Sequence, residues 1–168
     1  YQGDIAPVMM VLDASVHLIG PNGERMMPLS DFYQLDGMKK NVLEKGEFLL
    51  KVTLPEESIK RIGSYQKLRV RDSWDFPEAG VAASWIEGET KSIRLATTAL
   101  ESIPKNHTEE IEDIVNSKWE GKQSVKSLAA LIKKLVKPVN NTALPPNYRR
   151  SVVQVLVKRA LSKIDGDS

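Results

Sequence analysis

The sequence predicts an α+β protein in which the strands come first and the helices last. In the first part of the chain, short segments of alternating apolar and polar residues are separated by Gly, Pro, Asn and Asp. After Pro104, apolar residues recur at intervals of three and four, which is the spacing of an amphipathic helix. Strands and helices that are segregated along the chain are typical of the α+β class.

Residues 1–57 are expected to form a β-rich unit. It opens with an apolar stretch over residues 6–14, which is predicted to be helical or irregular. Asn22-Gly23 then lies between two alternating segments, and this dipeptide is a strong signal for a hairpin turn. Three strands are expected in this unit, over residues 15–20, 24–29 and 47–55.

Residues 58–168 are expected to form a second domain, with a three-stranded antiparallel sheet packed on about three helices. Short connections between the strands favour an antiparallel meander. The strands are predicted over residues 64–71, 81–88 and 91–100. The helices are predicted to begin at Thr108, near Ser124 and after Pro145-Pro146.

The composition argues against several kinds of site. The chain has no Cys, so it holds no disulfide or thiolate metal site. The absence of Cys fits a reducing compartment without proving one, and a cytoplasmic location is expected. His17 and His107 have no second His at ligand spacing, so no metal site is expected. The sequence has no Gly-rich phosphate loop and no nucleophile motif, so no catalytic residue is assigned. No apolar segment approaches the roughly 20 residues that span a bilayer, so no membrane span is expected.

Charge is unevenly placed, with a net −6 over residues 1–117 and +8 over residues 118–168. A basic helical region can bind nucleic acid or an acidic partner. Here the basic residues are scattered among apolar ones at helical spacing, and no aromatic RNA-binding motif accompanies them. A solvated helical face is therefore the preferred interpretation, and no nucleic-acid partner is expected.

Three features remain as candidates for a binding site. Asp4 follows Gly3 in a turn bounded by Pro7, where its carboxylate can cap a helix or accept hydrogen bonds from a ligand. The strand that contains Lys67 carries several cations on one face, which is either a solvated face or a face toward an anionic ligand or reduced cofactor. Residues 47–55 can lie against a flat ring or form an ordinary core strand.

Taken together, five segments resemble, in order, the flavin-binding medium subunit of the molybdenum hydroxylases, the xanthine dehydrogenase and carbon monoxide dehydrogenase family. The resemblance is closest to the β subunit of 4-hydroxybenzoyl-CoA reductase. It covers nearly the whole chain, although each segment alone is weakly specific. The segments are GDIAPVMMVLDASVHL (3–18), PNGERMMPLSDFY (21–33), NVLEKGEFLLKVTLP (41–55), YQKLRVRDSWDFPEAGVAASW (65–85) and YRRSVVQVLVKRAL (148–161).

The resemblance implies a flavin site of which this chain holds one part. Residues 1–57 resemble the end of the middle FAD-binding subdomain, and residues 58–168 resemble the C-terminal domain. The N-terminal half that binds the FAD pyrophosphate is expected as a missing partner. The family implies two other partners, a large subunit with molybdopterin and a small subunit with iron–sulfur clusters. Iron–sulfur clusters are expected on these partner chains or in the missing half.

Matched by motif, Gly3 and Asp4 correspond to the family's flavin-site aspartate segment, and Leu49 to a residue that lies against the isoalloxazine ring. Lys67 corresponds to a lysine near the ring, and Trp74 lies in a variable loop where it stacks on the flavin or simply packs.

The first functional hypothesis is a subunit of a multi-subunit oxidoreductase in which FAD relays electrons between iron–sulfur clusters and an external carrier, with this piece alone inactive. The alternative is a docking module with no flavin bound. The flavin hypothesis gains if Asp4, Leu49 and Lys67 face one cleft, and the docking hypothesis gains if they diverge.

Overall fold

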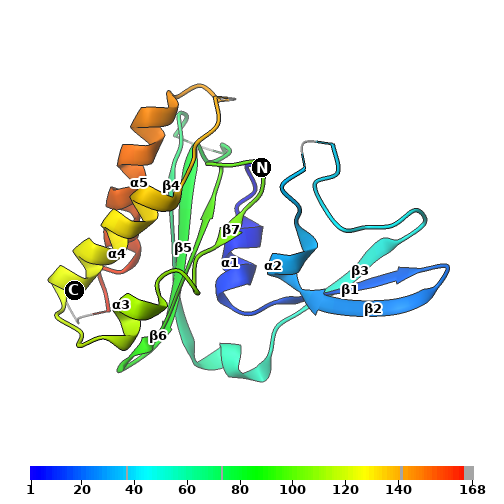
Figure 1. Ribbon diagram of the computed structural model, residues 1–168, viewed down its shortest axis with the longest axis horizontal. Coiled ribbons are helices and arrows are strands. Elements are labelled where there is room, and N and C mark those ends of the chain that lie inside the picture. The colour runs from blue at the N-terminus through cyan, green and yellow to red at the C-terminus, as the bar shows by residue number, and fades with distance from the viewer. Residues whose placement is uncertain (37, 73, 141, 165–168) are drawn as a thin grey trace.

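The computed structural model describes residues 1–36, 38–72, 74–140 and 142–164, and it consists of two sheets with helices on both sides of the larger one (Figure 1). The smaller sheet has the order β2-β1-β3 and the larger one β4-β5-β6-β7, and neighbouring strands are antiparallel in both. This α+β architecture confirms the predicted fold class.

The N-terminal part holds two short helices and the smaller sheet. Pro21 and Asn22 form the hairpin turn, and Gly23 directly after them has a φ of 105°, in the left-handed region that glycine tolerates. The elements are α1 (Ile5–Val11), β1 (Ser15–Gly20), β2 (Gly23–Pro28), α2 (Leu29–Phe32) and β3 (Phe48–Thr53).

The C-terminal part holds the larger sheet and three helices. A short 3-10 helix, η1 (Glu56–Lys60), leads from the smaller sheet into the larger one. The strands are β4 (Arg61–Leu68), β5 (Ala79–Ile86), β6 (Glu89–Thr98) and β7 (Lys105–Asn106). The helices are α3 (Glu112–Asn116), α4 (Lys122–Leu135) and α5 (Pro146–Ala160).

Several local expectations need correction, and β5 and β6 each begin two residues earlier than expected. The larger sheet has a fourth strand, because β7 pairs with Ala96 and Thr97 of β6. A two-residue strand is too short to show the alternation on which strand prediction depends. β4 begins three residues earlier than expected and ends at Leu68, so the residues that follow belong to a loop. Thr108 does not cap α3, because its amide and hydroxyl both donate to the side chain of Asn106.

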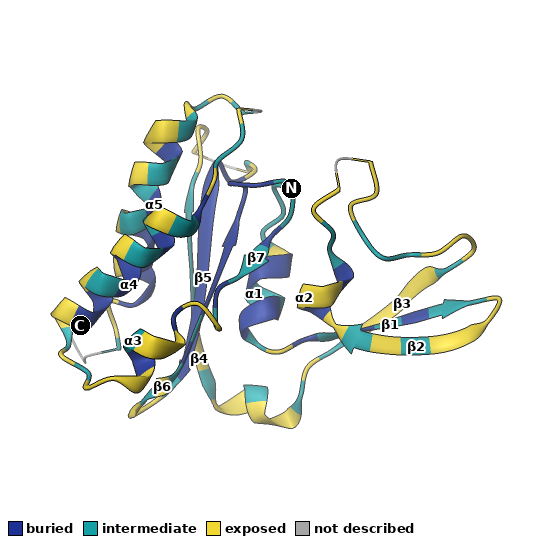
Figure 2. Cartoon of the chain, in the orientation of Figure 1, coloured by how far each residue is buried: buried dark blue, intermediate teal, exposed yellow. Residues whose placement is uncertain are grey.

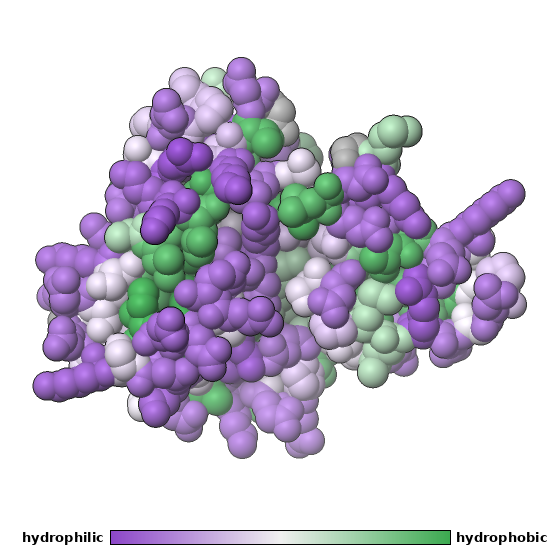
Figure 3. Space-filling view, in the orientation of Figure 1, coloured by the Kyte–Doolittle hydropathy of each residue, from purple (hydrophilic) through white to green (hydrophobic). Residues whose placement is uncertain are grey.

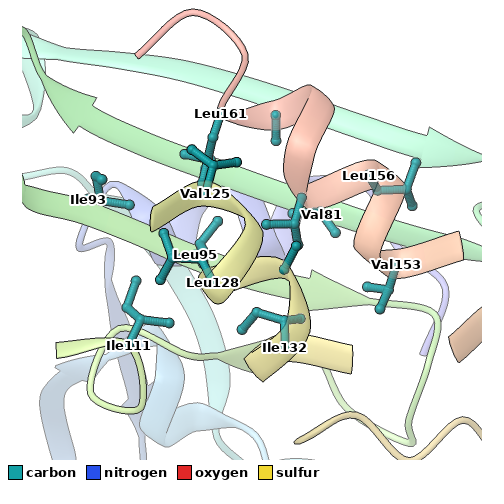
Figure 4. Close-up of a cluster of buried hydrophobic side chains, with 14 of the residues drawn as sticks. Val81, Ile93, Leu95, Ile111, Val125, Leu128, Ile132, Val153, Leu156 and Leu161 are labelled. Carbon is teal, nitrogen blue, oxygen red and sulfur yellow. The ribbon is translucent and has the colours of Figure 1, made fainter. Parts of the chain in front are cut away.

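The main core lies between the larger sheet and the layer formed by α4 and α5. Leu128 and Ile132 on α4 and Val153 on α5 are fully buried and point toward side chains of β5 and β6 (Figure 4). β5 is buried along nearly its whole length, because helices cover both faces of the sheet (Figure 2). A strand buried on both faces needs a nearly continuous apolar sequence, which β5 has.

A second apolar cluster lies on the opposite face of the larger sheet. Met10 and Val11 of α1 pack there with Val16 and Leu18 of β1, and the cluster includes Ala82 of β5. Alanine on the sheet lets the helix approach closely. This contact positions the residues that precede α1 beside the end of β4.

Candidate functional site

An open pocket of about 670 Å³ lies where the chain enters α1, next to the end of β4 and the loop that follows it. Three of the residues proposed from the sequence line it, and three further residues come from the loop after β4. The lining residues are Asp4, Lys67, Arg69, Trp74, Asp75 and Phe76.

Asp4 immediately precedes α1 but its side chain makes no capping hydrogen bond to the helix. Its carboxylate is bound by β4 instead. The Tyr65 hydroxyl donates to Oδ1 at 2.6 Å, and the Lys67 ammonium lies 2.9 Å from Oδ2. The ligand-binding interpretation of Asp4 is therefore compatible with its position, whereas the capping interpretation is wrong.

Lys67 connects Asp4 to the loop after β4. Its ammonium group donates to the Asp75 backbone carbonyl at 2.9 Å as well as to Asp4. An ammonium has three N–H donors, and the described residues accept two of them. The third donor is available to a group that enters the pocket.

Tyr65 was not proposed from the sequence, although it belongs to this network. Burial and the neighbouring Asp4 carboxylate raise the pKa of the Tyr65 phenol above its ordinary value of 10, so the hydroxyl stays protonated and acts as a donor. The available signal was the alternation of β4, which places Tyr65 and Lys67 on the same face of the strand.

The loop over residues 69–76 is held by Asp75. The Asp75 carboxylate accepts hydrogen bonds from the backbone amide and the guanidinium of Arg71, at 2.9 and 2.7 Å. These bonds hold the pKa of Asp75 well below its ordinary value. The loop presents Trp74 and Phe76, which are 99% and 68% exposed, and Arg69, which has no hydrogen bond or ion pair within the described ranges.

The structure does not bring all the proposed residues together. Gly3 lies beside Asp4, and its carbonyl accepts a hydrogen bond from the Thr98 hydroxyl at 2.9 Å. Leu49 lies on β3, where it pairs with Leu18 in the smaller sheet, and it is not among the residues that line the pocket. The pocket thus combines Asp4, Lys67 and Trp74, with Leu49 elsewhere in the same chain.

The two histidines have structural partners. His17 hydrogen-bonds Thr53 at 2.9 Å and the buried His107 hydrogen-bonds Thr97 at 2.9 Å. Across the part of the chain that the structure describes, no group of three or more His, Cys, Asp or Glu side chains is arranged to hold a metal ion. No helix in that part is long and apolar enough to cross a membrane.

The chain matches two known protein families along most of its length. Residues 1–57 match the FAD binding domain in molybdopterin dehydrogenase, and residues 64–164 match the CO dehydrogenase flavoprotein C-terminal domain. These matches define a class, the flavoproteins of molybdopterin-dependent dehydrogenases. The chain belongs to the CO dehydrogenase flavoprotein C-terminal domain family.

Individual relatives agree with this assignment. The chain is 25% identical to the carbon monoxide dehydrogenase medium chain of Afipia carboxidovorans, over 95% of this chain and 55% of that protein. It is 23% identical to the xanthine dehydrogenase FAD-binding subunit of Escherichia coli, over 95% of this chain and 55% of that one.

Among solved structures, carbon monoxide dehydrogenase from Hydrogenophaga pseudoflava superposes with a TM-score of 0.86 and 25% identity, over 99% of this chain and 57% of that chain. The chain therefore spans little more than half the length of the relatives it matches.

Proposed function

We propose that this chain forms one wall of the FAD site in the electron-transferring flavoprotein subunit of a molybdenum hydroxylase-type oxidoreductase. The observation that carries the proposal is the Asp4–Lys67 pair, which lines an open pocket at the edge of the part that matches an FAD-binding domain. The pocket has room for a planar ring, a spare N–H donor on Lys67, and the exposed indole of Trp74 beside it.

In this proposal the FAD, when bound, supplies the redox chemistry between iron–sulfur clusters and an external carrier, and the protein supplies orientation and charge. The Lys67 ammonium stabilises negative charge that develops on a ring in the pocket. Asp4 and the Asp75 carbonyl hold that ammonium in place. Trp74 shields the ring from water.

The same proposal includes the kind of enzyme, its partner subunits, the domain boundary and the location in the cell. The similarity of the segments to the 4-hydroxybenzoyl-CoA reductase β subunit supports a reductase of that kind, with a molybdenum-containing large subunit and an iron–sulfur small subunit as partners. We place the boundary between the FAD-binding part and the C-terminal domain after residue 57. We also propose a cytoplasmic location, because the chain lacks Cys.

Replacing Lys67 tests the role of its charge. Removing one charge at about 6 Å, with an effective dielectric of about 20, changes the energy of the reduced anionic ring by about 3 kcal/mol. For a two-electron couple this corresponds to a flavin reduction potential lower by on the order of 60 mV. We expect this shift in Lys67→Met but not in Lys67→Arg, measured by redox titration of the assembled flavoprotein. Equal potentials in both variants would contradict the proposed role.

A docking module without flavin is the second candidate. The position of Leu49 outside the pocket lining favours it, because the proposed ring contacts do not converge in this chain. An absorption spectrum of the assembled complex separates the two. A flavin band supports the FAD site, whereas an intact complex with no flavin under any condition supports the docking module.

A further inference from the structure

The turn between β1 and β2 places an asparagine directly before a glycine on the outside of the molecule. The turn residues are Pro21 and Asn22, and Gly23 follows as the first residue of β2. Asn22 and Gly23 are both exposed, and the described residues give the Asn22 side chain no hydrogen bond. This end of the hairpin projects from the rest of the chain in Figure 1, and the surface there is mostly hydrophilic in Figure 3. The side-chain amide of Asn22 is therefore open to water.

A glycine after an asparagine favours attack of the backbone on the asparagine side chain. The nucleophile is the backbone nitrogen of the following residue, and the atom attacked is the asparagine Cγ. A side chain on the following residue hinders this approach, and glycine has none. A Cβ atom built at Gly23 would meet nothing within 4 Å outside its chain neighbours, so no other group restricts this peptide either.

The backbone nitrogen of Gly23 is also held weakly. Gly23 and Gly20 form the last pair of the β1–β2 ladder, so opening this pair disturbs no pair beyond it. Pairs at the end of an element open at a low free energy. The amide that follows Asn106 is different, because it belongs to the buried His107 and donates to the Leu95 carbonyl at 2.8 Å. The fold therefore restrains the backbone after Asn106 but not after Asn22.

We propose that Asn22 is a site of spontaneous deamidation that converts it to aspartate and isoaspartate. The Gly23 nitrogen forms a bond to the Asn22 Cγ, and the bond between Cγ and Nδ2 breaks. The departing NH₂ group takes the proton of the Gly23 amide and leaves as ammonia. Water then opens the resulting succinimide ring at either of its two carbonyls, which gives aspartate or isoaspartate. The net reaction consumes one water and releases one ammonia, with no oxidation or reduction.

Isoaspartate adds one carbon atom to the backbone of a turn that is packed against the segment before β3. A Cβ atom at Gly46 would lie 3.2 Å from the Pro21 ring. A Cβ atom at Gly20 would lie 2.7 Å from the Glu47 side chain, which Arg25 holds by an ion pair at 2.7 Å. The longer backbone displaces the turn from this segment. The isoaspartate form is therefore expected to loosen the chain where it enters β3.

The test uses the assembled flavoprotein, which is incubated at neutral and at alkaline pH and then digested for mass spectrometry. We expect Asn22 to be converted at least about ten times faster than Asn106, because Asn22 alone among the asparagines precedes a glycine. Conversion is expected to be faster at alkaline pH, because the backbone nitrogen attacks as its anion. Protein L-isoaspartyl methyltransferase is expected to methylate the peptide that contains position 22. The matched peptide of Asn22→Gln is expected to remain unmethylated, since the longer side chain forms a ring far more slowly.

An intact Asn22 in the folded assembly would overturn the proposal, and conversion in the urea-unfolded chain would then identify the fold as the protection. Equal conversion of Asn22 and Asn106 would overturn it as well. Conversion to aspartate alone would also do so, because direct hydrolysis of the side chain by water yields no isoaspartate.

Amide hydrogen exchange measures the structural consequence. The Glu44 backbone nitrogen donates to the Glu47 carboxylate at 2.7 Å, so it reports on the segment before β3. Its exchange is expected to be at least about five times faster in the isoaspartate form than in Asn22→Asp, which adds the same charge without the extra backbone atom. Equal exchange in the two forms would overturn the loosening.

Discussion

At the scale of single residues, the pocket depends on one carboxylate that two side chains of β4 bind. Tyr65 and Lys67 are neighbours on the same face of the strand, and each takes one oxygen of Asp4. Because the Asp4 side chain is partly exposed, its pairing with Lys67 alone is worth little. The hydrogen bond from Tyr65 makes the orientation of Asp4 specific, so Tyr65 positions the site without lining it.

A double-mutant cycle with Tyr65→Phe and Asp4→Asn measures this contact. We expect a coupling energy of about 0.5–1.5 kcal/mol, because each substitution weakens the same hydrogen bond. The measurement is urea-induced unfolding of the four proteins in the cycle. Lys67→Met combined with Tyr65→Phe serves as a second cycle, since these two residues share Asp4 as a partner. Strictly additive effects in both cycles would show that the network is not energetically linked.

At the scale of elements, the close approach of β4 and β5 depends on a glycine. A Cβ atom at Gly80 would lie 2.6 Å from the Thr98 methyl carbon and 2.7 Å from the Tyr65 hydroxyl. Gly63, also in this strand pair, has space, because the nearest atom to an added Cβ is 4.0 Å away. The two positions therefore form a matched pair for substitution.

Gly80→Ala is expected to destabilise the chain by about 1–3 kcal/mol, because the added methyl group displaces Tyr65 from Asp4. Gly63→Ala is expected to be neutral or to stabilise by up to about 1 kcal/mol. Thermal unfolding followed by circular dichroism gives both values. Similar effects of the two substitutions would show that the spacing at Gly80 is not critical.

The loop before β3 is anchored by an ion pair. Arg25 of β2 donates to both carboxylate oxygens of Glu47, at 2.8 and 2.7 Å, and to the Val42 carbonyl at 2.9 Å. The hydrogen bonds from Arg25 lower the pKa of Glu47 from its ordinary 4.5 to about 2. This anchor sets the position at which the chain enters β3.

The Glu47 anchor is expected to weaken in acid. Because the folded pKa is lower than the ordinary value, its contribution to stability is present in full above about pH 4.5 and is lost as the pH falls toward 2. Glu47→Gln is therefore expected to be less stable than the wild type at pH 6 and nearly equal to it at pH 2, by urea unfolding. Glu24→Gln, which removes the same charge near the hairpin turn, is the control. A pH-independent difference for Glu47→Gln would contradict this account.

At the scale of the whole molecule, Arg149 joins parts that are far apart in sequence. Its fully buried guanidinium donates to the backbone carbonyls of Glu78, Ala99 and Val139 and to the Thr142 hydroxyl, at 2.6–2.9 Å. Burial lowers the pKa of Arg149, which shows the cost of removing this charge from water. The side chain thereby fixes α5 to the start of β5, where the pocket loop returns to the sheet.

Arg149→Met is expected to lower the free energy of unfolding by about 3–5 kcal/mol, because several buried acceptors lose their donor. Arg159→Met, on the exposed side of the same helix, is expected to change it by less than about 0.5 kcal/mol. Urea unfolding of the two variants, fitted with one common m-value, gives the two free energies of unfolding to be compared. A loss below about 1 kcal/mol for Arg149→Met would show that water replaces the guanidinium.

The sequence by itself determined the α+β class and the order of nearly all elements, and its resemblance to a known family put forward Asp4 and Lys67 as candidates. The class and the element order follow from local periodicity and turn residues, each of which involves neighbours along the chain. Only the tertiary structure decided that Tyr65 binds Asp4, 61 positions away, that Leu49 lies outside the pocket lining, and that β7 extends the sheet. The reason is physical, since such contacts depend on how α1 packs against the larger sheet, and no spacing along the chain encodes that packing.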